Sequence, residues 1–199
     1  IKHSSSNITI VSTSLKKIEV EAEIIKDPEL IYKFDKAFLP GVGSYKDAIT
    51  MIKKIGWEKA IKKFTADKDK SLFGICVGMQ ILSTYGYEYG KSEGLNIVKG
   101  DVEHMNSQGC NLKLPHIGWN NIKILKKNLI TKNLSDDSDF YFVNSYSLKI
   151  VNIDELIATT VYGIEFPSII NKVNIFGTQF HPEKSSNAGI QILKNFIDA

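Results

Sequence analysis

One cysteine, Cys76, stands between two glycines in the stretch 71–82, which reads SLFGICVGMQIL. A free cysteine is a small hydrophobic residue and is often buried for packing alone. The spacing G-x-C-x-G, however, is typical of a nucleophile elbow, in which glycines leave room for a sharp turn from strand to helix. Residues 71–75 are predicted as a buried strand, and a helix is predicted from Met79 onward. Cys76 would then lie at a helix N-terminus, where unpaired N–H groups favour a thiolate.

A thiol nucleophile needs a base, and the best candidate is His181 in the stretch GTQFHPEKSS. The residues before it read as a strand, and Pro182 favours an extended conformation at His181. In an extended chain residues i and i+2 point to the same side, so Glu183 should project beside His181. Glu183 would orient the imidazole and leave its other nitrogen to activate the thiol, as in a catalytic triad. For H-x-E taken alone, a surface turn with a solvated glutamate is the alternative.

The other cysteine and histidines are weaker candidates for catalysis. Cys110 lies in a polar stretch without an elbow, and His104 is predicted as a surface residue of a strand. His116, in LPHIGWN, would either pack in the core or contact a partner. The H-P-E stretch holds two potential metal ligands, and no further Cys/His cluster has ligand-like spacing, so we expect no metal site.

Acyl transfer also needs hydrogen-bond donors for a developing oxyanion. The N–H of Val77, directly after Cys76, is one predicted donor. The loop Pro40-Gly41-Val42-Gly43 follows a short predicted strand and would supply a second donor from Val42. A plain glycine-rich turn is the alternative interpretation of this loop.

The composition narrows the class of protein. A chain of 199 residues is long enough for one α/β domain with a full core. Its formal net charge of +3 is too small to indicate a nucleic-acid or membrane partner. The two cysteines form no disulfide pattern, no apolar run is long enough to span a membrane, and no signal peptide is visible. We therefore expect a cytoplasmic protein.

Strands and helices alternate in the first half of the chain, and strands dominate the second half. Helices are predicted at 8–18, 45–55, 57–64 and 188–197, and strands at 20–25, 37–39, 71–75, 100–105, 119–124, 140–143, 156–162, 168–172 and 175–179. This order predicts an α/β fold with a mostly parallel central sheet flanked by helices, an antiparallel strand-rich part in the second half, and one domain over residues 1–199. Catalytic groups of such folds gather at the carboxyl ends of strands, where Cys76, the 40–43 loop and His181 all fall.

The chain resembles the class I, or triad, glutamine amidotransferases. The matching segments occur in the family's order over most of the chain: FLPGVGSYKDAI, LFGICVGMQIL, LPHIGWNNI, YFVNSY and FGTQFHPEKSS. The pair GICVGMQ and QFHPE is specific to the class. The segments LPGVG, PHIGWN and FHPEKSS narrow the resemblance to the glutaminase subunits of imidazole glycerol phosphate synthase, from histidine biosynthesis.

The resemblance implies a flavodoxin-like α/β fold and a glutaminase that works through a thioester. Cys76 would attack the glutamine amide, His181 would act as base and acid, and Glu183 would orient it. Ammonia would pass to a (β/α)8-barrel synthase or cyclase partner in a heterodimer, without a metal or organic cofactor. The resemblance further implies oxyanion donors at Val42 and Val77, a glutamine pocket at Gly43, Gln80, Ser145 and Tyr146, and a partner interface near His116, Gly118 and Trp119.

Two stretches depart from the family's pattern. Residues 2–7 stand where the family has a D-Y-G-x-G-N loop, and the strand before that loop is mostly absent, so we expect an incomplete first strand. Asn144 stands where the family commonly has His. Three other functions remain open: a paralogous subunit that supplies ammonia for amidation of bacterial surface sugars, a catalytically silent module that activates a partner, and a cysteine peptidase or other hydrolase on a related fold. Trp119 could also be a simple core residue.

Overall fold

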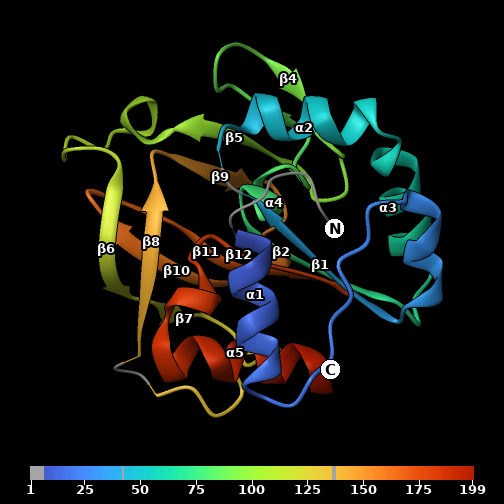
Figure 1. The fold of residues 1–199 in the computed structure, drawn as a ribbon. Helices are drawn as coiled ribbons and strands as arrows, with labels where there is room; N and C mark the ends of the chain where they lie inside the picture. The colour runs from blue at the N-terminus through green and yellow to red at the C-terminus, as the bar shows by residue number, and fades with distance from the viewer. Residues whose placement is uncertain (1–6, 42, 136–137) are drawn as a thin grey trace.

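The computed structural model describes residues 7–41, 43–135 and 138–199. Its centre is a six-stranded sheet surrounded by helices, with two smaller sheets beside it (Figure 1). The order of strands across the central sheet is β1 (Lys36–Gly41), β2 (Ser71–Cys76), β12 (Ile175–Thr178), β11 (Ile164–Lys172), β10 (Leu156–Tyr162) and β7 (Lys123–Ile124).

Five α-helices lie in the described part of the chain. They are α1 (Asn7–Lys16), α2 (Tyr45–Lys54), α3 (Trp57–Ala66), α4 (Val77–Gln80) and α5 (Ser186–Asp198). Gly56 separates α2 from α3 with a φ of 81°, which confirms the predicted break between them. Among the residues described, no helix is long and apolar enough to cross a membrane.

The α/β class is confirmed, but the central sheet is mixed rather than mostly parallel. β1 and β12 run parallel to β2, whereas β12, β11, β10 and β7 pair with one another in antiparallel fashion. The connections explain this, because only Gly163 separates β10 from β11, and Val173 and Asn174 separate β11 from β12. A parallel return needs a crossover of about a dozen residues or more, so these short loops permit hairpins only.

The antiparallel part expected from the second half of the sequence is shared between the central sheet and the two smaller sheets. One has the order β4 (Ser92–Glu93), β3 (Tyr85–Gly86), β5 (Gly100–His104) and β9 (Tyr146–Ile150). The other pairs β6 (His116–Asn121) with β8 (Asp139–Asn144). The strands β3, β4 and β9 were not predicted, and two of them are only two residues long.

Aromatic side chains fix α5 against the three parallel strands. Phe38 on β1, Phe73 on β2 and Phe176 on β12 are register partners and form one row across the sheet. The ring of Phe196 on α5 packs edge-on against all three, with centroid distances of 4.9, 5.0 and 5.6 Å. Because these rings bury a large apolar area, they hold rigid the strands whose carboxyl ends carry the predicted catalytic residues.

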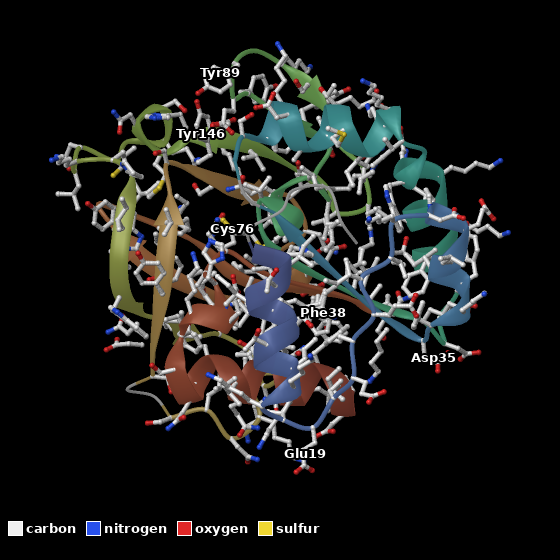
Figure 2. All side chains as sticks on the ribbon, viewed as in Figure 1. Glu19, Asp35, Phe38, Cys76, Tyr89 and Tyr146 are labelled. Carbon is white, nitrogen blue, oxygen red and sulfur yellow. The ribbon has the colours of Figure 1, made fainter. Side chains whose placement is uncertain are left out.

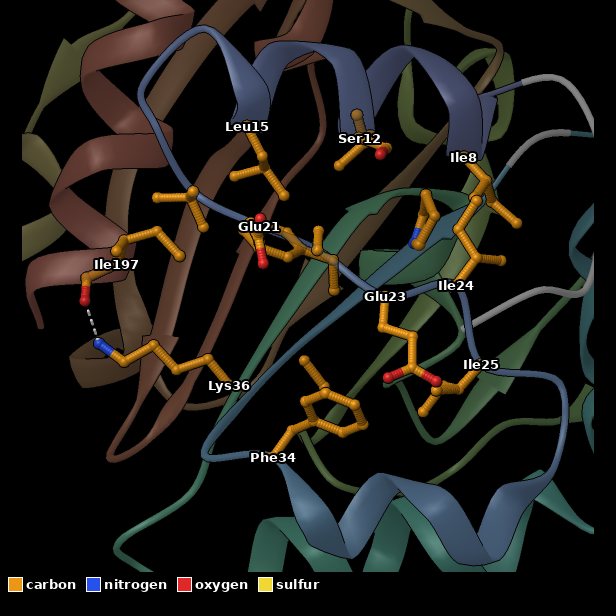
Figure 3. Close-up of a pocket in the computed structure, with 16 residues that line it drawn as sticks. Ile8, Ser12, Leu15, Glu21, Glu23, Ile24, Ile25, Phe34, Lys36 and Ile197 are labelled. Atoms are coloured by element: carbon orange, nitrogen blue, oxygen red, sulfur yellow. Dashed lines mark hydrogen bonds between the residues drawn. The ribbon is translucent and has the colours of Figure 1, made fainter.

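The strand predicted at 20–25 is wrong, since this segment has no regular secondary structure. A cavity of about 200 Å³ lies between it, α1 and β1 (Figure 3). A strand needs a neighbouring strand with which it exchanges backbone hydrogen bonds. Here the cavity separates the segment from β1, the edge strand of the sheet. The apolar residues of the segment therefore line the cavity instead of pairing in the sheet. Residues 2–6 of the altered first loop lie outside the described residues.

Candidate active site

Cys76 lies at the sharp turn where β2 ends and α4 begins. Its backbone angles, φ 53° and ψ −115°, fall outside the regions that residues with a side chain normally occupy. Such strain persists only where the surroundings enforce it, and it is concentrated at functional sites. Cys76 is buried, and Figure 2 shows it near the middle of the view, with Tyr146 higher in the same view. The helix that follows is a single turn, shorter than predicted, because the chain turns at once toward β3.

Glycines around Cys76 make this strained turn possible because the neighbouring backbones nearly touch. A Cβ added to Gly78 would lie 1.7 Å from the carbonyl oxygen of Leu39. A Cβ on Gly74 would lie 2.8 Å from the backbone of Met79, and one on Gly41 would lie 2.2 Å from the Gly78 nitrogen. The G-x-C-x-G spacing is thus a steric requirement of the elbow.

His181 follows β12 and is only 3% exposed. Its backbone N–H donates to the Tyr141 carbonyl at 2.9 Å, and its own carbonyl accepts from Ser185 Oγ at 2.6 Å. The ring atom Nδ1 lies 2.8 Å from Glu183 Oε1. Glu183 belongs to the 3-10 turn Pro182–Lys184 rather than to the extended chain that was predicted, yet it reaches the ring. Backbone and ring are therefore both held in place.

Two opposing effects set the charge of His181. Burial lowers its pKa, but the charge of Cys76, a hydrogen bond to Cys76 and the contact with Glu183 outweigh burial. Together they raise the pKa of His181 from the ordinary 6.5 to about 10. The ring consequently carries its proton at neutral pH next to the Cys76 sulfur, and the thiolate is the form in which a cysteine acts as a nucleophile.

A cavity of about 150 Å³ opens beside Cys76. Its lining consists of Gly43, Cys76, Val77, Gln80, Glu88, Pro115, Val143, Asn144, Ser145 and Tyr146. All four residues predicted for the glutamine pocket therefore lie around the cysteine. Val77 is the first residue of α4, where backbone N–H groups have no partner within the helix. Val42, the other predicted oxyanion donor, lies outside the described residues, so its role remains a prediction.

Gln179 is a site residue that the sequence analysis missed. It is fully buried, and its Nε2 lies 3.7 Å from the Cys76 sulfur. Its Oε1 accepts a hydrogen bond from Gln80 Nε2 at 3.0 Å. The available signal was its place two residues before His181, because alternate residues of an extended chain share a side.

Glu88 was missed as well, and it brings a carboxylate to the cavity. Its Oε2 accepts from the backbone N–H of Tyr45 at 2.6 Å. Burial raises the pKa of Glu88, and the hydrogen bond from Tyr45 partly offsets this. Its sequence context, YGYEYG, has no motif, so only the fold shows that this glutamate faces the cavity.

The three residues predicted at the partner interface have different environments. His116 is buried, and its ring stacks against Tyr162 and Phe142 with centroids 4.0 and 5.1 Å away. Burial lowers the pKa of His116. Its side chain is thus part of the core of this chain, and its place near a partner interface stays a prediction. Gly118 is half-buried, whereas Trp119 is 52% exposed and is not a core residue.

The remaining predicted candidates lie away from this arrangement. Cys110 is buried and its Sγ donates to the Tyr162 carbonyl at 3.2 Å, and it does not line the cavity. Within the described ranges, no three His, Cys, Asp or Glu side chains come together as a metal site. The chemistry that the geometry offers is nucleophilic attack by a thiolate next to an imidazolium.

Comparisons with known proteins agree with this chemistry. The family model described as glutamine amidotransferase class-I matches residues 1–199. A Campylobacter jejuni (strain RM1221) protein named imidazole glycerol phosphate synthase subunit HisH 1 is 41% identical, over 99% of this chain and 97% of that protein. The Pelagibacter ubique (strain HTCC1062) protein named imidazole glycerol phosphate synthase subunit HisH is 38% identical, over 100% and 97%.

Solved structures are similar in fold. A crystal structure described as a glutamine amidotransferase superposes with a TM-score of 0.75 at 18% identity, over 97% of this chain and 93% of that one. The structure of a putative GMP synthase protein from Thermoplasma acidophilum gives 0.71 at 17% identity, over 100% and 90%. At these identities the likeness concerns the fold alone.

Proposed function

The chain belongs to the glutamine amidotransferase class-I family, and we propose that it is the glutaminase subunit of an imidazole glycerol phosphate synthase in histidine biosynthesis. The observation that carries this proposal is the buried Cys76 at a strained elbow together with the buried His181, whose ring contacts Glu183. The similarity to HisH subunits over nearly the whole chain supports this choice of pathway within the family.

The first half of the reaction releases ammonia. The thiolate of Cys76 forms a bond to the side-chain amide carbon of glutamine, and the carbonyl electron pair moves onto oxygen. The N–H of Val77, with that of Val42 as the proposed second donor, stabilises this oxyanion. His181 then gives its proton to the amide nitrogen, the C–N bond breaks, ammonia leaves, and a thioester remains on Cys76.

The second half restores the enzyme and depends on a change in His181. Thioester formation removes the negative charge of Cys76, the largest of the effects that raise the pKa of His181. Burial then favours the neutral ring, which can take a proton from water. The resulting hydroxide adds to the thioester, the sulfur leaves as thiolate, and glutamate is released. In sum, glutamine and water yield glutamate and ammonia.

Glutamine also carries an α-ammonium group and an α-carboxylate, which the cavity must hold. Glu88 is the carboxylate of the lining, and we infer that it pairs with the ammonium group. Gly43, Ser145 and Tyr146 would surround the rest of the substrate. Replacing Glu88 with Gln should raise KM for glutamine about tenfold or more with little change in kcat, since the pair is made equally in ground and transition states.

A synthase partner would dock beside this cavity and receive the ammonia. Two residues of β6, Ile117 and Trp119, are 60% and 52% exposed, and exposed apolar groups of this size on neighbouring positions favour a protein partner. The register partner of Ile117 is Val143 on β8, which lines the cavity. The face is therefore continuous with the site where ammonia forms. A (β/α)8 barrel is the partner fold that the resemblance implies.

The test is glutamine hydrolysis by the chain alone, with its synthase partner, and with partner plus an analogue of the ammonia acceptor. We expect a slow rate alone and a large rise only in the complete mixture, because uncoupled hydrolysis would waste glutamine. Equal rates in all three would indicate an independent hydrolase. Absence of hydrolysis in all three would indicate a silent module. Trp119→Ala should weaken association with the partner without changing the basal rate.

A further inference from the structure

Two buried side-chain amides, Gln80 and Gln179, connect the wall of the cavity to the Cys76 sulfur. Gln80 Nε2 donates to the Tyr146 carbonyl and to Gln179 Oε1, both at 3.0 Å. Gln179 Nε2 lies 3.7 Å from Cys76 Sγ. Gln80 is 3% exposed and Gln179 is fully buried. We call these two residues the amide relay, and neither belongs to the triad.

The hydrogen bonds of the relay fix the orientation of both amides. The Tyr146 carbonyl only accepts, so the amide end of Gln80 that faces it must be the NH₂ group. The same NH₂ group faces Gln179, whose nearest atom must therefore be its oxygen. The NH₂ group of Gln179 is then left pointing at the sulfur. Reversing either amide would place two donors or two acceptors against each other.

This orientation distinguishes the charged sulfur from the neutral one. A thiolate accepts hydrogen bonds only, and the amide of Gln179 and the ring of His181 both donate to it. The Val143 carbonyl, 3.9 Å from Sγ, is an acceptor and can receive a hydrogen bond only from the protonated thiol. A donor to the charged form favours that form. Gln179 and His181 thus stabilise the thiolate, whereas the Val143 carbonyl stabilises the protonated thiol.

We propose that Gln179 holds the Cys76 thiolate in place for attack, and that Gln80 is a positioning residue that fixes the Gln179 amide. This inference rests on the proposed function, since it adds a role within the same site. The Tyr146 carbonyl also accepts from Asn144 Nδ2 at 3.2 Å, so the relay is anchored at a point that two cavity residues share. The amide relay therefore connects the Tyr146 carbonyl, at the wall of the substrate pocket, to the sulfur of Cys76.

The titratable groups around the sulfur are few, and the test leaves all of them unchanged. His181, with Glu183 behind it, lies after β12, and Glu88 and Tyr146 lie on the cavity walls. Gln80 and Gln179 are neutral, so a change in the pH at which the thiolate forms after their substitution reports the loss of the amide relay and not the loss of a neighbouring charge.

The experiment measures alkylation of Cys76 by iodoacetamide as a function of pH, with peptide mass spectrometry, on the whole chain. Gln179→Met keeps the size of the side chain and removes the donor. It should move the pH midpoint of alkylation upward by about one unit or more, the usual effect of a hydrogen bond to a charged group. Gln80→Met should shift the midpoint in the same direction by a smaller amount, because Gln179 can then reverse its amide.

The matched control is Gln108→Met. The Gln108 amide donates to the Glu103 carbonyl and to Ser147 Oγ and does not line the cavity, so its loss should leave the midpoint unchanged. Unshifted midpoints in both relay variants would overturn the relay. If Gln179→Met does not fold, as judged by thermal unfolding, Gln80→Met decides alone. Glutamine hydrolysis by the unchanged chain with its partner is measured in parallel, and its absence would overturn the proposed function instead.

Discussion

The cavity beside α1 is larger than the cavity beside Cys76, yet it is not the candidate active site. The α1 cavity, about 200 Å³, is lined mainly by aliphatic side chains from α1 and residues 20–25. The cavity beside Cys76, about 150 Å³, is lined by a thiol, a carboxylate, amides and backbone of a strained turn. Size therefore does not identify the site. The site is identified by polar groups that converge on a strained backbone turn.

The charged groups of the two cavities show the same contrast. Lys36 lines the cavity beside α1, and burial lowers its pKa, offset in part by Asp198 and Asp35. Its ammonium group donates to carbonyls at the end of α5, among them that of Ile197 (Figure 3) and that of Phe196 at 3.1 Å. This lysine caps a helix and is already satisfied by the fold. His181 instead faces a nucleophile whose charge changes during a reaction.

Removal of the Cys76 thiol is the substitution with the largest expected effect, and it tests whether the cavity beside Cys76 is the active site. Cys76→Ala should abolish glutamine hydrolysis, with a loss on the order of 10⁶ in kcat, as for other nucleophiles that act as part of a unit. Cys110→Ala is the matched control, because this cysteine is equally buried but does not line the cavity. Steady-state assays with the partner present check both. Residual activity in Cys76→Ala close to that of the control would refute the assignment.

Glu183→Gln tests the residue that orients the base. The amide can still hold the ring through Nδ1 but does not stabilise the imidazolium by charge, so turnover should fall by about 10⁴. The fold should persist, since the substitution preserves size and shape. The measurement is kcat together with the thermal unfolding curve. Turnover like that of the unchanged protein would show that Glu183 only supports the local structure.

Gly78→Ala tests whether the elbow is set by backbone contact. The added Cβ would lie 1.7 Å from the Leu39 carbonyl oxygen, so the turn must shift, at a cost of about 3 kcal/mol in stability. Gly90→Ala is the control, because a Cβ there meets nothing within 4 Å and only the positive φ of 96° costs about 1 kcal/mol. Denaturant unfolding measures both. Similar losses in the two variants would contradict the steric explanation.

The smallest effects on activity are expected beside the α1 cavity. Ile24 is 44% exposed and Ile25 is 5% exposed, although they are adjacent. Ile25→Ala should destabilise the fold by about 3 kcal/mol, whereas Ile24→Ala should cost about 0.5 kcal/mol. Both folded variants should hydrolyse glutamine at the unchanged rate. A loss of activity in Ile24→Ala would link this cavity to the reaction and break the comparison.

The sequence predicted the region around Cys76 well because its constraints are local. The glycines at 74 and 78 mark a close backbone approach, and the three residues from His181 to Glu183 are a sequence unit. The mixed sheet was harder to foresee, since the pairing of β11 with β12 depends on a short loop rather than on a strand pattern.

Residues whose role depends on distant neighbours were not found. The segment 20–25 has the alternation of a strand, but whether it becomes one depends on an edge to pair with. Glu88 and Gln179 reach the site from other elements, and their neighbours in sequence give little indication of this. The stacking of His116 with Tyr162 likewise depends on a residue 46 positions away in the chain, so the sequence left open whether this histidine packs in the core.

The central claim is that Cys76 and His181 form a thiolate–imidazolium pair, and NMR titration of the histidine rings tests it most directly. His181 should keep its proton until the pH reaches about 10, whereas the buried His116 should lose its proton below the ordinary value of 6.5. In Cys76→Ala the pKa of His181 should fall, because burial then acts with less opposition. Loss of the His181 proton at or below pH 6.5 in the unchanged protein would contradict the account.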